Sequence, residues 1–324
     1  MKAPGSFLTF FTLPMVLRRA AGAGQWCYDS QDVSCGPVHW KDINHNCGGE
    51  NQSPVNIDRT QIQRGQKLGD MVFQGYDIAP PGRWRLMNDG HSVLVRLEEE
   101  TVMGYINISG AGLPNTFQAL QFHFHWGSSK GNGSEHTVDG KQYPMELHIV
   151  HLNAKYRSIT DAKKDPHGLA VLGFLVTVAE ADNPNYNTIL AGLKNVPNEG
   201  NFVDLASTFR LDSLLPGMDK LSRYYRYQGS LTTPDCAESV IWTLFEDPIP
   251  ISRAQLRVFV DTVYFTAASE RSVKMINNFR PPQPLKSRKV YASKDATISH
   301  SAPVRVGLPA SLYLLLIAQV LHHL

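Results

Sequence analysis

Residues 121–126 read Gln-Phe-His-Phe-His-Trp, and Glu146-Leu147-His148 follows further along the chain. Successive side chains of a β-strand point to opposite faces. His123 and His125 therefore share one face, and the three aromatic residues of the stretch share the other. The aromatic face predicts a packed core. On the opposite face, the two imidazoles lie about 6–7 Å apart along the strand, close enough to bind one ion.

The second segment also alternates and places Glu146 and His148 on one face. The Gly- and Ser-rich run 127–134 and the pair Asp139-Gly140 favour turns between the two strands. If the strands pair antiparallel with their polar faces matched, three histidines surround one point. Three histidines with an open fourth position are typical of catalytic zinc, although imidazole also suits copper, iron or nickel.

A His-x-His pattern on an amphipathic strand is often only a half-exposed polar face. Here Gln121 and Glu146 each stand two residues before a candidate ligand and on its face. A ligating histidine normally donates its other ring N–H to such an acceptor. This pattern favours a metal site.

The composition is that of one large globular domain. The chain has 324 residues, 42% hydrophobic and 19% charged, and a formal net charge of +2 without a long basic run, which argues against nucleic-acid binding. Apolar periodicity predicts strands at 92–97, 102–108, 169–178 and 240–245, and helices at 187–193, 205–211 and 252–264. We expect a single α+β domain dominated by a largely antiparallel sheet.

Several motifs in order resemble the α-class carbonic anhydrases, from about Trp26 to Leu285. They are Gln52-Ser-Pro-Val-Asn-Ile57, Asn88-Asp-Gly-His91, Gln121-Phe-His-Phe-His-Trp-Gly127, Gly133-Ser-Glu-His-Thr-Val138, Glu146-Leu-His148, Gly168-Leu-Ala-Val-Leu-Gly173, Gly229-Ser-Leu-Thr-Thr-Pro234 and Asn278-Phe-Arg-Pro281. The resemblance implies a large twisted, mainly antiparallel sheet with a few short peripheral helices. It is strongest to the extracellular branch anchored by glycosylphosphatidylinositol (GPI).

The resemblance also implies the chemistry: reversible hydration of CO2 to bicarbonate, with Zn²⁺ held by His123, His125 and His148. In the family a hydroxide from zinc-activated water attacks CO2. The resemblance places Thr232, Thr233 and Glu135 among the catalytic residues: Thr232 accepts a hydrogen bond from the hydroxide and donates its own O–H to Glu135.

Further roles follow from the resemblance alone. His91 matches the histidine that exports the proton to buffer, and nearby Asp89 is expected to raise the His91 pKa. The apolar CO2 pocket comprises Val150, Val171, Leu231, Val240 and Trp242. Gln121, Asn278 (through its backbone) and Glu146 support His123, His125 and His148 respectively. The histidines His136, His151 and His167 are interpreted as structural or surface groups.

Cytosolic relatives carry a tyrosine after a His-Trp-Gly near the N-terminus. Here His39-Trp40 is followed by Lys41-Asp42-Ile43. We therefore expect the water chain between zinc and His91 to differ from theirs.

The N-terminus has the features of a secretory signal peptide, residues 1–23. Lys2 is followed by an apolar run, 7–17, and by small residues, Ala21-Gly22-Ala23, at the expected cleavage site. The catalytic domain is then expected at 24–290 and a polar spacer with a C-terminal anchor signal at 291–324. The apolar end, 307–321, is too short and interrupted for a comfortable transmembrane helix.

Four cysteines on a secreted chain indicate disulfides, with three possible pairings. Cys27 and Cys35 are close enough in sequence to close a small loop, which would leave Cys47 for Cys236. The resemblance implies this same pairing.

Modification sites complete the expectations. Asn107 and Asn132 begin glycosylation sequons, and small residues at Ser299 and Ser301 are candidate GPI attachment points.

The expected protein is a monomer on the extracellular face of the plasma membrane, with CO2, bicarbonate and water as its reactants and bicarbonate transporters as associates. The alternative is a non-catalytic binding module on the same scaffold. It is disfavoured because the three histidines, Thr232 and Glu135 are all present.

Overall fold

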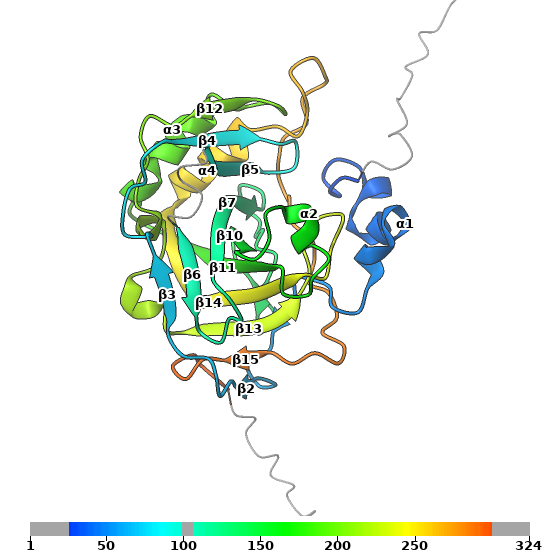
Figure 1. Cartoon of the computed structure of the whole chain (residues 1–324). Coiled ribbons are helices and arrows are strands. Elements are labelled where there is room, and N and C mark those ends of the chain that lie inside the picture. Colours follow the sequence, from blue (N-terminus) through cyan, green and yellow to red (C-terminus); the bar gives the residue numbers. More distant parts are fainter. Residues whose placement is uncertain (1–25, 99–105, 300–324) are drawn as a thin grey trace, which may run out of the picture.

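The structure is a computed structural model that describes residues 26–98 and 106–299. One twelve-stranded sheet dominates it (Figure 1). Ten strands follow one path across the sheet, in the order β12 Phe202–Asp204, β4 Arg83–Asn88, β5 Val93–Glu98, β7 Phe117–Trp126, β10 Met145–Asn153, β11 Leu169–Ala179, β14 Val240–Ser252, β13 Tyr224–Gly229, β15 Tyr291–Ala292 and β2 Gln63–Arg64. Off this path, β3 Met71–Gln74 pairs with β6 Asn107–Gly110, which also pairs with β7.

The sheet is mainly antiparallel, as the sequence predicts. Only β11 with β14 and β15 with β2 pair parallel within it. A separate three-stranded sheet contains β1 Asn56–Ile57, β8 Thr137–Val138 and β9 Lys141–Gln142. The predicted Asp139-Gly140 turn connects β8 to β9, so the link between β7 and β10 contains a hairpin of its own.

The helices are few and short. They are α1 Trp40–Ile43, α2 Ile159–Ala162, α3 Asn187–Leu193 and α4 Arg253–Thr262, with 3₁₀ turns η1 Val33–Cys35, η2 Pro37–His39, η3 His45–Gly48, η4 Pro184–Tyr186, η5 Leu211–Leu214 and η6 Met218–Lys220. Helix α4 begins at a capping box in which Ser252 and Gln255 bond each other's backbone N–H groups. Within the described residues, no helix is long and apolar enough to span a membrane.

Two sequence-based elements need correction. The predicted helix at 205–211 does not form: the Leu205 N–H donates to the carbonyl of Trp84 and so extends the pairing of β12 with β4. The predicted strand at 102–108 lies partly outside the described residues, and the observed strand β6 begins at Asn107.

The two faces of β7 divide the interior as expected. Phe122, Phe124 and Trp126 belong to a buried aromatic core, where Phe124 and Trp126 contact Phe259 of α4. In Figure 1, α3 and α4 lie on one side of the molecule and the N-terminal arm with α1 lies on the other. The opposite face of β7 carries the histidines.

The packed fold continues beyond the expected domain end at residue 290. Strand β15 pairs with β13, Ala296 is buried, and the Ser299 N–H donates to the Arg59 carbonyl. Residues 291–299 are therefore part of the domain and not a free spacer. The signal peptide 1–23, Ser301 and the apolar end 307–321 lie outside the described residues.

Candidate metal centre

Strand pairing brings the three histidines together. Strands β7 and β10 are antiparallel, with His123 opposite His148 and His125 opposite Glu146. Because directly paired residues point to the same face, all four side chains lie on one side of the sheet. One ring nitrogen from each histidine can be chosen so that the three atoms lie within 4.8 Å of one another. The register therefore builds a three-nitrogen cluster.

Each histidine has one nitrogen engaged elsewhere. Nδ1–H of His123 donates to Gln121 Oε1 at 3.0 Å, and Nδ1–H of His125 donates to the Asn278 carbonyl at 2.7 Å. Nε2–H of His148 donates to Glu146 Oε1 at 2.6 Å. These bonds fix each ring and leave His123 Nε2, His125 Nε2 and His148 Nδ1 as the nitrogens with free lone pairs.

The electrostatics favour neutral imidazoles. Burial lowers the pKa of His123 well below that of a free imidazole, and neighbouring His125 and His148 lower it further. Burial also lowers the pKa of His125, although the nearby Glu135 carboxylate opposes the shift. Unprotonated nitrogens of this kind are the form that binds a metal.

The donor set fits a divalent metal ion. Nε2 of His125 is buried and has no hydrogen-bond partner among the described residues, whereas buried polar atoms are nearly always paired. Three neutral nitrogens without protein partners suit zinc, and also copper, iron or nickel.

A second group that could bind a metal contains His136, Glu146 and His148. Its atoms are already bonded to one another: Nδ1–H of His136 donates to Glu146 Oε1 at 2.7 Å, and Nε2 of His136 is hydrogen-bonded to the Tyr227 hydroxyl at 2.6 Å. We therefore interpret this group as a hydrogen-bond network that supports His148. His136 is structural, as the sequence suggested.

Glu146 connects this network to Glu135. Burial by itself would raise the Glu146 pKa, but the imidazoles of His136 and His148 hold it well below its usual range. The other oxygen, Oε2, accepts the backbone N–H groups of Glu135 and His136, each at 2.8 Å. The same carboxylate thus orients a ligand candidate and the loop that carries Glu135.

Glu135 is fully buried beside the histidines. Its Oε1 accepts the Arg280 backbone N–H at 2.8 Å, and its Oε2 lies 3.4 Å from His125 Nε2. Oε2 has no hydrogen-bond partner among the described residues, so the bond expected from Thr232 is not formed in this structure.

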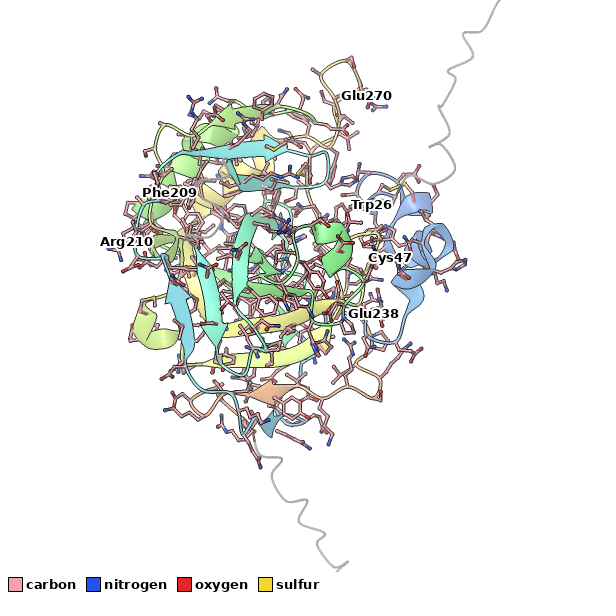
Figure 2. The ribbon with its side chains drawn as sticks, in the orientation of Figure 1. Trp26, Cys47, Phe209, Arg210, Glu238 and Glu270 are labelled. Carbon is pink, nitrogen blue, oxygen red and sulfur yellow. A yellow bond between two sulfur atoms is a disulfide. The ribbon has the colours of Figure 1, made fainter. Side chains whose placement is uncertain are left out.

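Thr232 is buried in the loop after β13, next to the half-buried Thr233. The loop is closed by a bond from the Leu231 N–H to the Ala237 carbonyl and by the disulfide Cys47–Cys236. The second disulfide joins Cys27 to Cys35. Both pairings agree with the sequence-based expectation. Figure 2 shows Cys47 in the N-terminal arm, with Glu238 nearby.

The predicted substrate pocket is one apolar cluster on the site side of the sheet. Val150 is opposite Val171, and Val171 is opposite Trp242. The Trp242 ring lies 4.8 Å from the His148 ring, centroid to centroid. Val240 belongs to the same cluster and Leu231 packs against it. The structure therefore brings all five predicted residues together beside the histidines.

His91 is partly buried under the N-terminal arm. Its ring stacks on Trp26 at 3.8 Å between centroids (Trp26 is labelled in Figure 2), beside a cavity of about 220 Å³ that Glu199 also lines. Burial lowers the His91 pKa, and Asp89 raises it by a smaller amount. The rise in the His91 pKa that was expected from Asp89 is therefore smaller than the fall caused by burial. Nδ2–H of Asn278 donates to the His91 carbonyl, so one residue contacts both His91 and His125.

One relevant residue was missed in the sequence. Tyr28 is buried against Trp26 and Trp40, and its hydroxyl has no hydrogen-bond partner among the described residues. Burial raises its pKa, as does the charge of Glu135. A tyrosine therefore lies near the site, although it does not follow His39-Trp40. The sequence signal that could have identified Tyr28 was its position two residues after Trp26, on the other side of Cys27.

The two predicted glycosylation sites differ in exposure. Asn107 is only 6% exposed and lies within β6, so it does not suit glycosylation, whereas Asn132 is exposed.

Two histidines outside the metal centre lie in different environments. His151 is buried on the opposite face from His148, with its Nε2 bonded to the Tyr76 hydroxyl at 2.6 Å. His167 is exposed.

The comparisons with known proteins agree with this geometry. Residues 35–294 match the model of the eukaryotic-type carbonic anhydrases. Carbonic anhydrase 15 of Mus musculus is 46% identical over 296 residues, 91% of each chain. Carbonic anhydrase 4 of Oryctolagus cuniculus is 38% identical over 86% of this chain and 88% of that protein. Carbonic anhydrase 12 of Homo sapiens is 35% identical over 90% and 79%.

Proposed function

The chain belongs to the eukaryotic-type carbonic anhydrase family and is an enzyme that hydrates CO2; on that premise we propose that it works with Zn²⁺ held by His123, His125 and His148. The observation that carries the proposal is the convergence of three unprotonated nitrogens, each on a ring whose other nitrogen is hydrogen-bonded. Such paired outer bonds are the usual arrangement behind metal-ligating histidines.

Zinc held by three neutral imidazoles would act as a Lewis acid and lower the pKa of water, so that a hydroxide nucleophile would form near neutral pH, an effect for which carbonic anhydrases are the standard example. The remaining work falls to the protein. Glu135 Oε2 is a buried acceptor without a hydrogen-bond partner in the described part of the chain, and we assign it to the Thr232 hydroxyl. With its own O–H donated to Glu135, Thr232 would accept a hydrogen bond from the attacking hydroxide and so orient a hydroxide lone pair toward CO2.

The substrate side is apolar. CO2 carries no net charge and needs no strong hydrogen bond, so a pocket of valine, leucine and tryptophan side chains is suited to it. We assign this role to Val150, Val171, Leu231, Val240 and Trp242, which line one side of the histidines. Bicarbonate is charged and is held less well by the same surface, which favours its release.

Each hydration leaves one proton to be exported. We assign this step to His91, whose ring is only partly buried and whose backbone is tied to the site through Asn278. Its lowered pKa favours rapid release of the proton to buffer at neutral pH.

We also propose that the enzyme acts outside the cell, attached to the plasma membrane by a GPI anchor near Ser299 or Ser301, as a monomer that associates with bicarbonate transporters. In this proposal residues 1–23 are a signal peptide, and Asn132 is the accessible sequon. The two disulfides support an oxidising compartment.

Metal reconstitution tests the zinc assignment. Protein stripped with a chelator is returned to one equivalent of Zn²⁺, Cu²⁺ or Ni²⁺, and the hydration of CO2 is followed by stopped flow. We expect Zn²⁺ to restore activity and to raise the unfolding temperature. Full activity in the stripped, metal-free protein would refute the proposal.

A further inference from the structure

Arg226 is a buried arginine of β13 without an acidic partner. Only 7% of its surface is exposed. Nε–H donates to Thr243 Oγ1 and Nη1–H to the Ala111 carbonyl, each at 3.0 Å, while Nη2 has no hydrogen-bond partner among the described residues. Among the described residues no carboxylate contributes to the electrostatics of the guanidinium, and its one charged or titratable neighbour is Tyr224. Burial lowers the Arg226 pKa to about 10, so the group remains charged at neutral pH.

A buried charge without a counter-ion destabilises a fold. Buried arginines are normally paired with an opposite charge. Arg280 illustrates an alternative, because its Nη1 and Nη2 donate to the backbone carbonyls of Ser53 and Cys47 and to the side chain of Gln52. At Arg226 the bonds to Thr243 and Ala111 leave Nη2 without a hydrogen-bond partner among the described residues, and the charge faces the Tyr224 ring, 5.5 Å away, instead of a carboxylate.

Arg226 lines a cavity of about 520 Å³. Lys67, Arg288 and Lys289 also line it, and no acidic residue does. The walls include the apolar side chains of Leu68 and Ile241. A cavity with this charge and these walls suits a ligand that has an anionic end and an apolar body.

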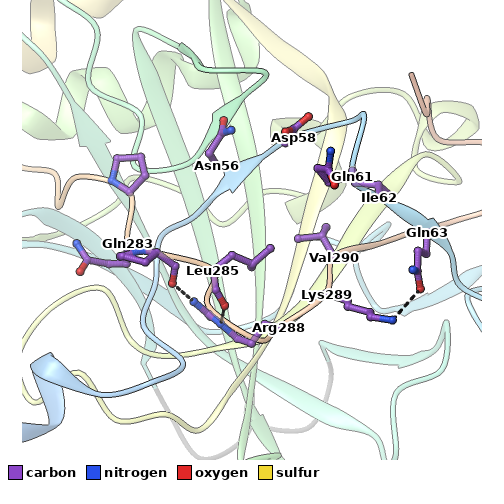
Figure 3. A pocket seen from close by; sticks show the side chains of 12 residues that line it. Asn56, Asp58, Gln61, Ile62, Gln63, Gln283, Leu285, Arg288, Lys289 and Val290 are labelled. Atoms are coloured by element: carbon purple, nitrogen blue, oxygen red, sulfur yellow. Dashed lines mark hydrogen bonds between the residues drawn. The ribbon is translucent and has the colours of Figure 1, made fainter. Parts of the chain in front are cut away.

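A neighbouring cavity of about 750 Å³ shares Arg288 and Lys289 but has a different character (Figure 3). Asp58 lines it, and Arg288 donates to the carbonyls of Leu285, Gln228 and Gln52 at 2.8–3.1 Å. These bonds occupy the Arg288 donors. Arg288 therefore adds positive charge to both cavities, but only the smaller one has a buried arginine with a free donor.

We propose that the 520 Å³ cavity binds an organic carboxylate, whose charged end pairs with Arg226 and whose apolar body lies against Leu68 and Ile241. A planar guanidinium can bind the two oxygens of a carboxylate in a bidentate manner, and the apolar walls select an anion that carries an organic body. The site is separate from the metal centre. None of the three histidines lines this cavity, although Tyr227, which bonds His136, does.

The binding is tested by calorimetric titration of the folded enzyme with 4-bromobenzoate and, as a second probe, octanoate. The variants are Arg226→Met, which keeps an unbranched apolar side chain but removes the guanidinium, and Arg257→Met, a matched change at an exposed arginine of α4. Wild type and Arg257→Met should bind equally, and Arg226→Met should bind at least 10-fold more weakly. Equal binding by Arg226→Met, or no binding of either probe to wild type, overturns the proposal.

Two controls keep the result interpretable. Arg226→Met also removes the bonds to Thr243 and Ala111, so circular dichroism and the unfolding temperature, both measured without ligand, establish that the variant is folded before its binding is compared. Ile241→Phe fills the cavity from its wall while leaving the guanidinium in place, and it should also weaken binding. Anomalous scattering from bromine in soaked crystals should place the probe at Arg226. Bromine found only beside the three histidines would refute the site.

Discussion

Nε2 of His125 lies 3.4 Å from Oε2 of Glu135, and neither buried atom has a hydrogen-bond partner in the described part of the chain. Buried polar atoms without partners are rare and call for an explanation. The proposed function explains both atoms: the nitrogen binds zinc, and the oxygen accepts a hydrogen bond from the Thr232 hydroxyl. Predictions about both atoms, and about the elements that hold them, follow from this assignment.

Glu135→Gln tests the acceptor. The amide keeps an oxygen for the Arg280 backbone N–H, but it presents an NH2 group to Thr232 and so loses the acceptor that sets the hydroxyl. We expect kcat/KM for CO2 hydration to fall about 100-fold, the usual cost of a misaligned reacting group, with zinc content unchanged. Stopped-flow assays and metal analysis check this, with exposed Glu50→Gln as control. Unchanged kcat/KM in Glu135→Gln would exclude the assigned role.

Trp26→Ala tests the environment of His91. The stacked indole contributes to the burial that lowers the His91 pKa. Its removal exposes the imidazole, which stabilises the charged form, so the pKa should rise toward the ordinary value of 6.5. An NMR titration of the His91 ring measures the change. Trp26→Phe, which retains a stacked ring, should shift the pKa less; a fall or no change in Trp26→Ala would contradict this account.

His151 makes stability depend on pH. Burial lowers its pKa from 6.5 to about 4 in the folded protein. Between these values the unfolded chain binds a proton that the folded chain does not, so stability falls as pH falls. At pH 4.5 wild type should have lost about 2 kcal/mol through this residue relative to pH 7. Denaturant unfolding of wild type and His151→Gln at both pH values measures it. An identical pH dependence in the two proteins would contradict the prediction.

The two disulfides should differ in their effect on stability. Cys47–Cys236 joins residues 189 apart, whereas Cys27–Cys35 joins residues 8 apart. Loop-closure entropy predicts losses of about 5 and about 2.5 kcal/mol when each pair is changed to alanine. Denaturant unfolding of the two double variants compares them. The Cys47/Cys236 variant should also lose activity, because its loop carries Thr232. A larger stability loss from the short loop would argue against this reasoning.

Most of the site could be predicted from the sequence, because side chains alternate between the two faces of a β-strand and the spacing of residues therefore tells which of them share a face. The spacing of His123, His125 and His148 was enough to predict one three-histidine cluster, and the described structure has it. The sequence could not show that Glu146 bonds His136 and the backbone of Glu135 as well as His148. The Asp139-Gly140 turn was predicted, but local patterns do not show that the residues before β8 fold back onto Glu146.

The errors have similar causes. The apolar spacing of Leu205, Phe209 and Leu211 is that of a helix, but the backbone of Leu205 finds a strand partner in Trp84. Tyr28 was overlooked because its contact with the site arises from the folding of the N-terminal arm, which the Cys27–Cys35 disulfide holds. The Asn107 sequon is valid in sequence and buried in the fold. In each case a partner distant in sequence decides the outcome.

The most direct test of the zinc assignment is the zinc content and CO2 hydration rate of wild type and His125→Ala, purified in parallel. An exposed histidine variant, His45→Ala, serves as control. The account predicts one zinc per wild-type and His45→Ala molecule with rapid hydration, and loss of both metal and activity in a folded His125→Ala. Rapid hydration by a folded His125→Ala that contains no zinc would contradict it.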